Sequence, residues 1–409
     1  MQTQTRAGTA GPPAVSLVSS ALDRLTRSTW WIFAVAAAGF AILHRGVWAG
    51  AGWHWFVTGA HVLFSPAGLH LYAAHSELQI GPLTLVAVAP LVFGLPRHAA
   101  ELTAMALMSA AGLAVLAQTR QLLPRRGRRE DRAFLLVGLC FIAVWSELAV
   151  TYSHPDDVLA ILFSVVALVA LRSDRDVSGA LLLALAVDCK PWALAFAPAL
   201  LLVQRRDRGR AVAVGVAGVV IAWLPFLLAD PKTASAGTFR IANSLASSLR
   251  VLGVHAAGTP LWDRPAQIAL GAALGVLAVA RGRWPAVILV AVAARLLLDP
   301  AIKSYYDAGL LAGAALCDLV LFAGRIPWLS ISAVVAFYLP AYLLQSDPHA
   351  YGLLRTAYLV AVVVIVVACP DRLFRGPGPR PSDGSTLPRR TVGPCAIEFG
   401  DETTDLVTS

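Results

Sequence analysis

The chain has 409 residues, of which 57% are hydrophobic and only 14% are charged, whereas soluble domains carry about 25% charged residues. Apolar runs long enough to cross a bilayer recur between residues 30 and 369. The net charge of +9 is spread over loops and helix ends, without the aromatic-interleaved basic patch of a nucleic-acid binder. The composition therefore excludes a soluble domain and a nucleic-acid partner, and it predicts an all-α polytopic membrane protein.

The two ends of the chain differ from its middle. Residues 1–28 are polar and contain three arginines, so we expect a cytoplasmic N-terminal segment that leads into an uncleaved first helix. Residues 29–369 form the predicted membrane domain. Residues 370–409 are rich in Pro, Gly, Ser and Thr and are predicted to be a disordered cytoplasmic tail. The five cysteines show no C-x-x-C pairing, which argues against a disulfide framework or a zinc site.

The first membrane elements follow from the distribution of arginines, because short basic loops stay on the cytoplasmic side. Residues 30–43 cross outward, and the external stretch after them contains an amphipathic segment, residues 53–64, that is predicted to lie in the membrane interface. The basic loop at residues 120–132 must be cytoplasmic, yet two apolar runs precede it, residues 81–95 and 102–118. We therefore expect the first run, which contains two prolines, to be a short re-entrant helix and the second to be a true span.

A short hairpin is predicted at residues 179–203, because basic residues flank it on both sides and it is too short for two spans of about 20 residues each. Its turn, DCKP at residues 188–191, reaches the outer half of the membrane and must be lined by protein or water. The bundle of about 10–12 helices is completed by apolar runs at residues 211–229, 266–280, 285–298, 308–323, 326–344 and 354–369.

This arrangement places an unusual set of polar residues on the external side. The set includes SHPDD at residues 153–157, HSELQ at 75–79, the turn at 188–191, the loop at 230–264 and the segment at 295–307. Ionisable groups at membrane depth are costly, so their default interpretation is functional. Carboxylates, histidines and cations that face one external cavity suit a phosphate-bearing ligand drawn from the outer leaflet.

Structural explanations remain open for these residues. Asp156 and Asp157 stand where a helix begins, and acids there favour the helix dipole, although a cap accounts for only one carboxylate. Lys190 has Asp188 as a nearby partner in the sequence.

The later polar residues have similar alternatives. Arg295 and Asp299 are spaced i, i+4 and can form an intrahelical pair. Tyr305 and Tyr306 can belong to an interfacial aromatic belt, and His54 can be a plain interfacial side chain.

The order of these motifs resembles GT-C class membrane glycosyltransferases, and most closely the actinobacterial proteins near glycosyltransferase family 87. The motifs are the amphipathic segment after the first span, QIGPL, HPDD, DCKPWAL, RLLLDP and KSYYDAG, and the resemblance covers residues 30–369. It implies a GT-C-like bundle in the bacterial plasma membrane, with an amphipathic external first loop, a re-entrant helix and both termini cytoplasmic. It also implies transfer of mannose or arabinofuranose from a polyprenyl-phosphate donor to an extracytoplasmic glycan or glycolipid acceptor.

The resemblance further implies roles for individual residues. The catalytic acid of the family stands in the first external loop, where this chain has Gly52. The base is then Asp156, Asp157, Glu77 or His54, and the sequence leaves the choice open. The residues predicted to bind substrate are His154, Lys190, Arg295, Lys303, Tyr305 and Tyr306, with the cations directed at the phosphate.

Three further questions stay open at this point. No cofactor is predicted, although paired acids bind a divalent cation in some members of the wider class. A non-catalytic relative that binds polyprenyl lipid is one alternative function. A transporter or flippase of a lipid-linked sugar is another, but the sequence shows no internal repeat of the kind that transporters carry.

Overall fold

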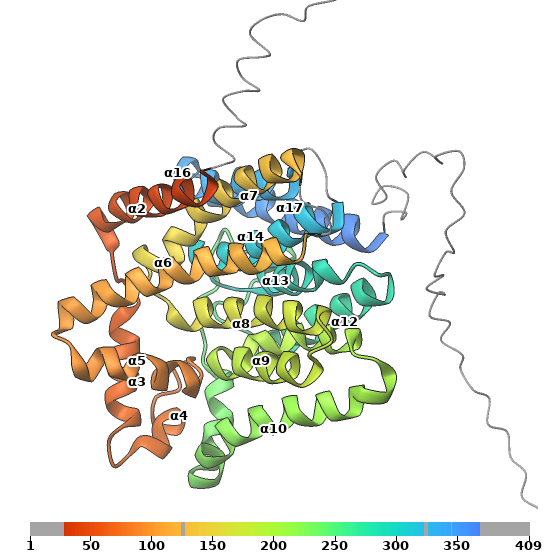
Figure 1. Ribbon diagram of the computed structural model, residues 1–409. Helices are drawn as coiled ribbons and strands as arrows, with labels where there is room; N and C mark the ends of the chain where they lie inside the picture. The colour runs from red at the N-terminus through yellow and green to blue at the C-terminus, as the bar shows by residue number, and fades with distance from the viewer. Residues whose placement is uncertain (1–27, 124–126, 323–325, 345, 369–409) are drawn as a thin grey trace, which may run out of the picture.

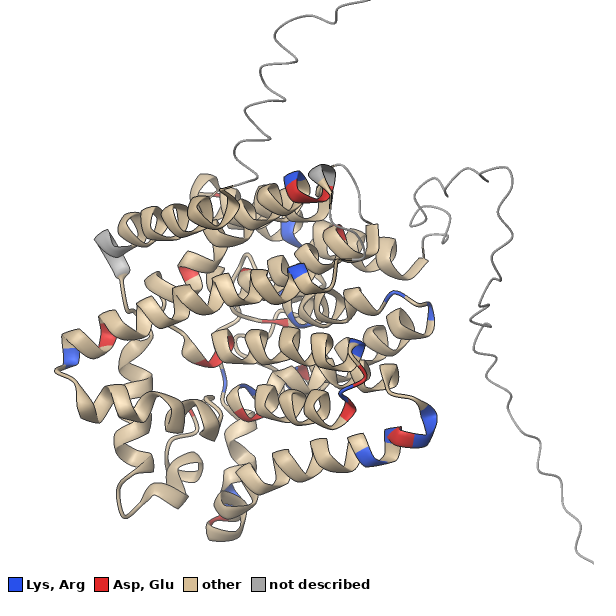
Figure 2. Cartoon of the chain, viewed as in Figure 1, with Lys and Arg blue, Asp and Glu red and all other residues tan. Residues whose placement is uncertain are grey.

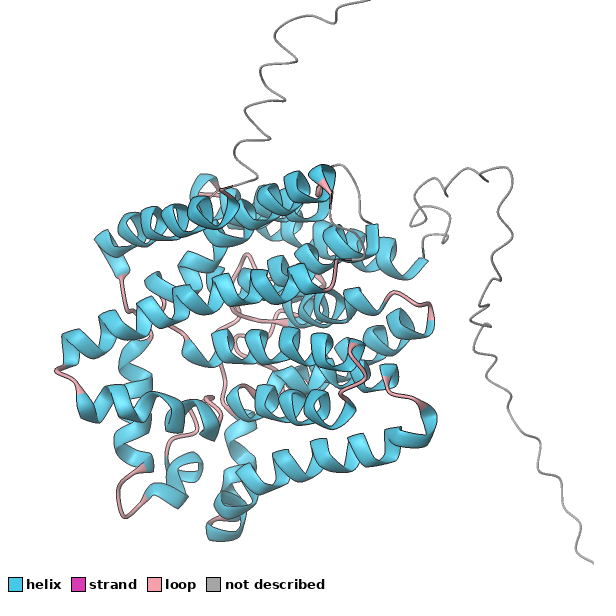
Figure 3. Ribbon diagram, viewed as in Figure 1, coloured by secondary structure: helices cyan, strands magenta, loops and turns pink. Residues whose placement is uncertain are grey.

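The computed structural model describes residues 28–123, 127–322, 326–344 and 346–368. Over these residues the regular structure is helical and contains no named strand (Figure 3), which confirms the all-α prediction. The predicted tail, and the predicted N-terminal segment apart from Ser28, lie outside the described residues.

Most of the long helices lie one above another and run across the view in Figure 1, whereas α3 runs at a steep angle to them. The α-helices are α2 (Thr29–Trp48), α3 (Trp53–Leu63), α4 (Leu71–Ala74), α5 (Pro82–Gly94), α6 (Arg97–Gln121), α7 (Arg128–Ser146), α8 (Pro155–Arg172), α9 (Asp176–Cys189), α10 (Arg205–Ala229), α11 (Ser248–Val251), α12 (Asp263–Ala280), α13 (Val287–Leu298), α14 (Asp307–Leu316), α15 (Trp328–Ala333), α16 (Leu339–Leu343) and α17 (Pro348–Ala368). The 3-10 segments are η1 (Gly68–His70), η3 (Pro191–Leu202), η4 (Pro231–Thr238), η5 (Trp284–Ala286) and η6 (Ser304–Tyr306), and the π-helical segments are η2 (Glu147–Thr151), η7 (Cys317–Phe322) and η8 (Val334–Tyr338).

Several helices are long and apolar enough to cross a membrane. Within the described residues, five meet this criterion: Arg97–Gln121, Glu130–Thr151, Arg205–Ala229, Ser304–Phe322 and Pro348–Ala368. The second is 83% buried over its most apolar window and forms part of the core, whereas the third, which is α10, is only 11% buried. Large apolar side chains of α10 such as Ile221 and Leu228 are exposed, as expected where the surroundings are lipid. The chain is a multi-pass membrane protein.

Helices α3 and α5 have the amphipathic face and the short length that were predicted for them. In α3, Trp53, Phe56 and Ala60 are buried on one face, which confirms the amphipathic segment. Helix α5 has 13 residues and is therefore about 20 Å long at 1.5 Å per residue, well short of a hydrocarbon core of about 30 Å. A helix of this length fits the predicted re-entrant element.

The predicted hairpin at residues 179–203 is also short. It consists of α9, with 14 residues, and the 3-10 segment η3, with 12 residues, joined through Lys190. Pro191 starts η3 and Pro198 lies inside it, and proline removes the backbone donor that an α-helix would use. Lys190 itself has an extended backbone, so its side chain leaves the axis of α9 and enters the bundle.

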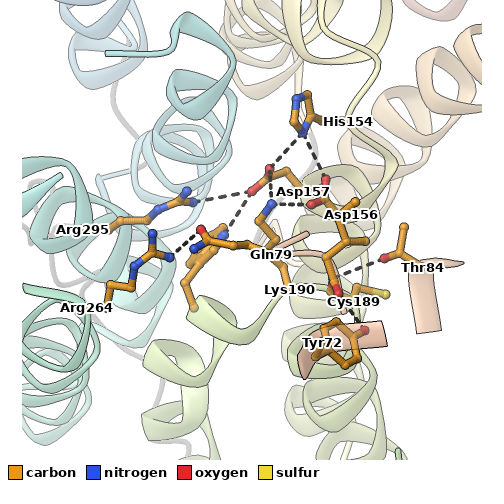
Figure 4. Close-up of polar contacts among 12 residues, drawn as sticks. Tyr72, Gln79, Thr84, His154, Asp156, Asp157, Cys189, Lys190, Arg264 and Arg295 are labelled. Atoms are coloured by element: carbon orange, nitrogen blue, oxygen red, sulfur yellow. Dashed lines mark hydrogen bonds and ion pairs between the residues drawn. The ribbon is translucent and has the colours of Figure 1, made fainter. Parts of the chain in front are cut away.

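Charged residues are distributed unevenly over the bundle. In Figure 2 the lysines and arginines gather near the edge where α8 ends and α10 begins, on the right of the view. This is the arrangement that the positive-inside rule predicts for cytoplasmic loops. The start of α8 and the end of α9 lie at the other end of these helices, and the polar cluster described next is built there (Figures 1 and 4).

Candidate functional site

The cluster begins at the first turn of α8. Pro155 opens the helix, where its fixed φ and missing N–H suit the position, and Ser153 before it has a φ of 50°. Asp156 and Asp157 follow and are 0% and 3% exposed. Asp156 Oδ1 accepts one hydrogen bond from the backbone N–H of Asp157 at 2.9 Å. Of the four carboxylate oxygens, only this one accepts a backbone N–H at the start of α8. The others face side chains, most of them from distant elements.

Lys190 lies beside both carboxylates (Figure 4). Its Nζ donates to Asp156 Oδ2 and lies 3.5 Å from Asp157 Oδ2. The buried ammonium is therefore compensated by two neighbouring carboxylates. The sequence alternative, a pair with Asp188, is wrong: the Oδ1 atom of that residue is buried without a hydrogen-bond partner among the described residues.

Asp157 is shared with two further residues. Trp192 Nε1, from η3, donates to its Oδ1 at 3.0 Å, and Arg295 Nη1, from α13, lies 3.5 Å from the same atom. The Arg295 guanidinium sits over the ring of Trp192 at 4.4 Å and over that of Tyr306 at 4.1 Å. Tyr306 is therefore part of the cluster and is not a lipid-facing belt residue.

Arg295 has a second carboxylate partner. Its Nε lies 3.8 Å from Asp299 Oδ2, which confirms the i, i+4 pair. Burial raises the pKa of the Asp299 carboxyl, while Arg295 opposes that rise. The guanidinium thus links the end of α13 to the start of α8.

His154 closes the cluster on the side of α8. Its Nδ1 lies 3.4 Å from Asp156 Oδ1 and 4.0 Å from Asp157 Oδ2. The imidazole stacks on Tyr305, with ring centroids 4.1 Å apart and planes 15° apart, and meets the edge of Phe56 at 5.6 Å. The ring is therefore held by two aromatic contacts and by the carboxylates beside Nδ1.

Arg264, at the start of α12, is a cation of this site that sequence reasoning missed. Its Nη1 donates to Gln79 Oε1 at 2.5 Å and its Nη2 donates to the carbonyl oxygen of Phe239 at 3.0 Å. Among the described residues no carboxylate lies within salt-bridge distance of it, although it points toward the same region as Arg295 (Figure 4). The signal in the sequence is an arginine in a segment predicted to be external, where the positive-inside rule depletes arginine.

Three predicted site residues lie outside this cluster. Glu77 is exposed and pairs with His75 at 3.2 Å. His54 is exposed beside Trp55, with ring centroids 4.5 Å apart, and Lys303 is exposed in the segment before η6. Their functional assignments remain predictions.

The residue types at the start of α8 also suit a divalent cation. His154, Asp156 and Asp157 each offer one ligand atom, and these atoms lie within 4.8 Å of one another. However, Lys190 Nζ contacts Asp156 and lies 3.5 Å from Asp157. The ammonium already occupies the place of a cation, so a metal ion would have to displace it.

A comparison with protein-family models finds one family whose match includes the residues of the cluster. Residues 80–321 match the model of glycosyltransferase family 87. The match covers more than half of the chain and runs from the residue before Gly81 to the residue before the end of η7. The match includes the start of α8, the hairpin turn, Arg264 and Arg295, whereas Gly52, His54 and Glu77 precede it. A search of curated proteins and a search of solved structures each find no match.

Proposed function

Because the chain belongs to glycosyltransferase family 87, we propose that it moves mannose or arabinofuranose from a polyprenyl-phosphate donor to an extracytoplasmic glycan or glycolipid. Family membership makes it a glycosyltransferase. The donor and acceptor classes are supported by the chemistry of the cluster and by the apolar surface beside it. The observation that carries the proposal is an arginine without a carboxylate partner at the membrane-embedded site.

Charge accounting identifies that arginine. Lys190 and Arg295 lie within salt-bridge distance of Asp156, Asp157 and Asp299, so both cations are directly paired. The charge of Arg264 interacts with Asp299 only at longer range. Arg264 is bound only by an amide and a carbonyl oxygen. A guanidinium with neutral partners suits a phosphate, because charge-assisted hydrogen bonds to an anion are the strongest that it can form. We assign the donor phosphate to Arg264, with Arg295 behind it.

The prenyl chain requires an apolar surface next to the phosphate. A groove of about 420 Å³ lies between α3, α5, α9 and α10 and is lined by apolar side chains, with Asp188 as its acidic residue. Val86 and Ile221 line the groove and are also exposed to the surroundings of the bundle. Because Asp188 is two residues from Lys190, a chain in this groove lies close to the cluster. We propose that the prenyl chain enters here from lipid.

The proposal also includes a location. An external site for a lipid-linked sugar fits the bacterial plasma membrane, with the N- and C-termini in the cytoplasm. The gathering of basic residues at the edge of the bundle opposite the cluster supports this orientation.

Binding and transfer are tested separately with the full-length protein in nanodiscs. Decaprenyl phosphate should bind to the wild type, and Arg264→Gln should weaken binding by about 10- to 100-fold, the scale of a charged hydrogen bond. Arg97→Gln is the matched control, because Arg97 is exposed at the start of α6. Equal affinities for wild type and Arg264→Gln would remove Arg264 from the phosphate site.

Transfer is measured from decaprenyl-phosphate donors that carry labelled mannose or arabinofuranose to a panel of octyl glycosides. Transfer of either sugar by the wild type supports the proposed function. Binding without transfer would indicate a non-catalytic relative. Movement of the labelled donor between leaflets of a vesicle, again without transfer, would indicate a flippase.

A further inference from the structure

We propose that His154 is the base that deprotonates the acceptor hydroxyl, and that Asp156 and Asp157 are positioning residues for it. This inference rests on the proposed function and assigns the step that the sequence leaves open. It follows from three features of the cluster: the partners of the carboxylates, the orientation of the imidazole, and the backbone of Gly52.

The two carboxylates are poorly suited to accept a proton. Asp156 is fully buried and its Oδ2 accepts from Lys190, while Asp157 Oδ1 accepts from Trp192 and lies 3.5 Å from Arg295. Cations and hydrogen bonds directed at a carboxylate favour its charged form and so weaken it as a base. Their oxygens instead form a negative surface beside the imidazole.

The imidazole is oriented by that surface. Nδ1 is buried without a hydrogen bond among the described residues, and the negative Asp156 Oδ1 lies 3.4 Å from it. The carboxylate favours a ring proton on Nδ1, which leaves the lone pair on Nε2. Stacking on Tyr305 and the edge contact with Phe56 restrict rotation of the ring. A histidine held in one tautomer by a carboxylate is the arrangement that serves as a general base in hydrolases and transferases.

The opposite edge of the ring faces Gly52 across the first external loop. Gly52 N–H donates to the carbonyl oxygen of Tyr152 at 2.7 Å, and the two preceding residues make parallel bonds to Val150 and Thr151. A Cβ on Gly52 would lie 2.6 Å from Nε2 of His154 and 2.6 Å from the Tyr152 carbonyl oxygen. Only glycine therefore lets the Nε2 edge of the ring approach the backbone of the first loop this closely, and 15% of the His154 side chain as a whole stays exposed.

The proposed step balances with these groups. Nε2 of His154 takes the proton of the acceptor hydroxyl as the acceptor oxygen forms a bond to the anomeric carbon of the donor sugar. The bond between that carbon and the phosphate oxygen breaks, and its electron pair stays on the phosphate, where Arg264 stabilises the added charge. The imidazolium is stabilised by the two carboxylates and later releases its proton to water.

The test measures transfer by wild type, His154→Ala and His154→Gln with the labelled donors described above. Both variants should lose about 10²-fold or more in kcat, the scale of general-base contributions, with little change in donor KM. Added imidazole should restore part of the activity of His154→Ala, because that variant leaves a ring-sized space, and none of the activity of His154→Gln. His61→Ala is the control, since His61 is an exposed histidine of α3.

Two further outcomes decide the assignment. Gly52→Ala should also lose activity, because its Cβ displaces the imidazole, and imidazole should not rescue it. Wild-type rates in His154→Ala would overturn the inference while leaving the proposed function in place, and so would a loss that imidazole never rescues. An inactive wild type would overturn the proposed function, and this inference with it.

Discussion

Asp156 is fully buried at the start of α8, and a carboxylate in that position is tolerated only with a cation beside it. Lys190 supplies that cation from the far end of α9, at a sequence separation of 34 residues. The pair therefore ties two membrane elements together and also keeps Asp156 charged next to His154. The stability of the bundle and the electrostatics of the site depend on the same contact.

Replacing Lys190 should show how much the stability of the bundle depends on its contact with Asp156. Lys190→Met leaves Asp156 buried without its cation and should cost about 3–5 kcal/mol of unfolding free energy, the scale for breaking a buried pair. Thermal unfolding of the detergent-solubilised protein measures the effect. Lys190→Met combined with Asp156→Asn should recover part of the loss, because the uncompensated charge is then gone.

Lys232→Met serves as the matched control for that series. Lys232 is exposed in η4, so its loss should change stability by less than about 0.5 kcal/mol. If Lys190→Met were as mild as this control, the Lys190–Asp156 contact would not be a buried ion pair in the protein.

At the scale of elements, the re-entrant helix and the hairpin turn support each other. Gly81 N–H, just before α5, donates to the carbonyl oxygen of Cys189 at 2.9 Å, and Thr84 Oγ1 donates to the same oxygen at 3.3 Å. These bonds satisfy a carbonyl at the end of α9, where no further helical turn follows. The close approach explains why glycine stands at position 81: a Cβ there would lie 1.9 Å from the Asp188 carbonyl oxygen.

Two glycines at opposite ends of α5 test this contact. Gly81→Ala should push α5 away from the hairpin, lower the thermal midpoint by several degrees and reduce transfer, because the backbone of Asp188 cannot move without displacing Lys190. Gly94→Ala should be neutral or slightly stabilising, since a Cβ at that position meets nothing within 4 Å and alanine favours helix. Equal stabilities of the two variants would contradict a packed interface between α5 and the hairpin.

At the scale of the whole molecule, apolar side chains cover the surface that faces lipid, and charged side chains lie at the ends of the helices. Helix α10 is 25 residues long and turns apolar side chains outward along its length, as a helix at the edge of a membrane bundle must. The basic residues gather near its N-terminal end in Figure 2, and the external segment η4 follows its C-terminal end. The charge at the two ends of this helix therefore predicts the orientation of the whole protein.

Single cysteines at the two ends of α10 test the orientation. Gly237→Cys, in η4, should react with a membrane-impermeant maleimide on intact cells, whereas Gly209→Cys should react only after permeabilisation. Both positions have open space around their Cα atoms, so the label is not blocked by packing. The background has Cys140, Cys369 and Cys395 replaced by serine, because Cys140 is only partly buried, whereas Cys189 and Cys317 are buried. Labelling of both cysteines from one side would refute the positive-inside assignment.

The sequence alone was enough to predict that this protein lies in a membrane and where its main helices are. Hydrophobic runs and arginine placement predicted the helical membrane bundle, the short α5 and the hairpin, because both signals are local and are set by bilayer thickness and charge. The same signals brought Asp156, Asp157, His154, Lys190 and Arg295 into one candidate site.

Only the tertiary structure decided which of these groups are partners. Because the backbone of Lys190 is extended, its side chain points away from Asp188, two residues earlier, and contacts Asp156. No local sequence pattern predicts which of these two acids is the partner. Packing of α12 against α13 likewise brings Arg264 near Arg295, while Glu77 and His54 remain on exposed surfaces. The physical reason is that periodicity fixes which face of a helix is buried, whereas the partner of a buried charge depends on how separate elements pack.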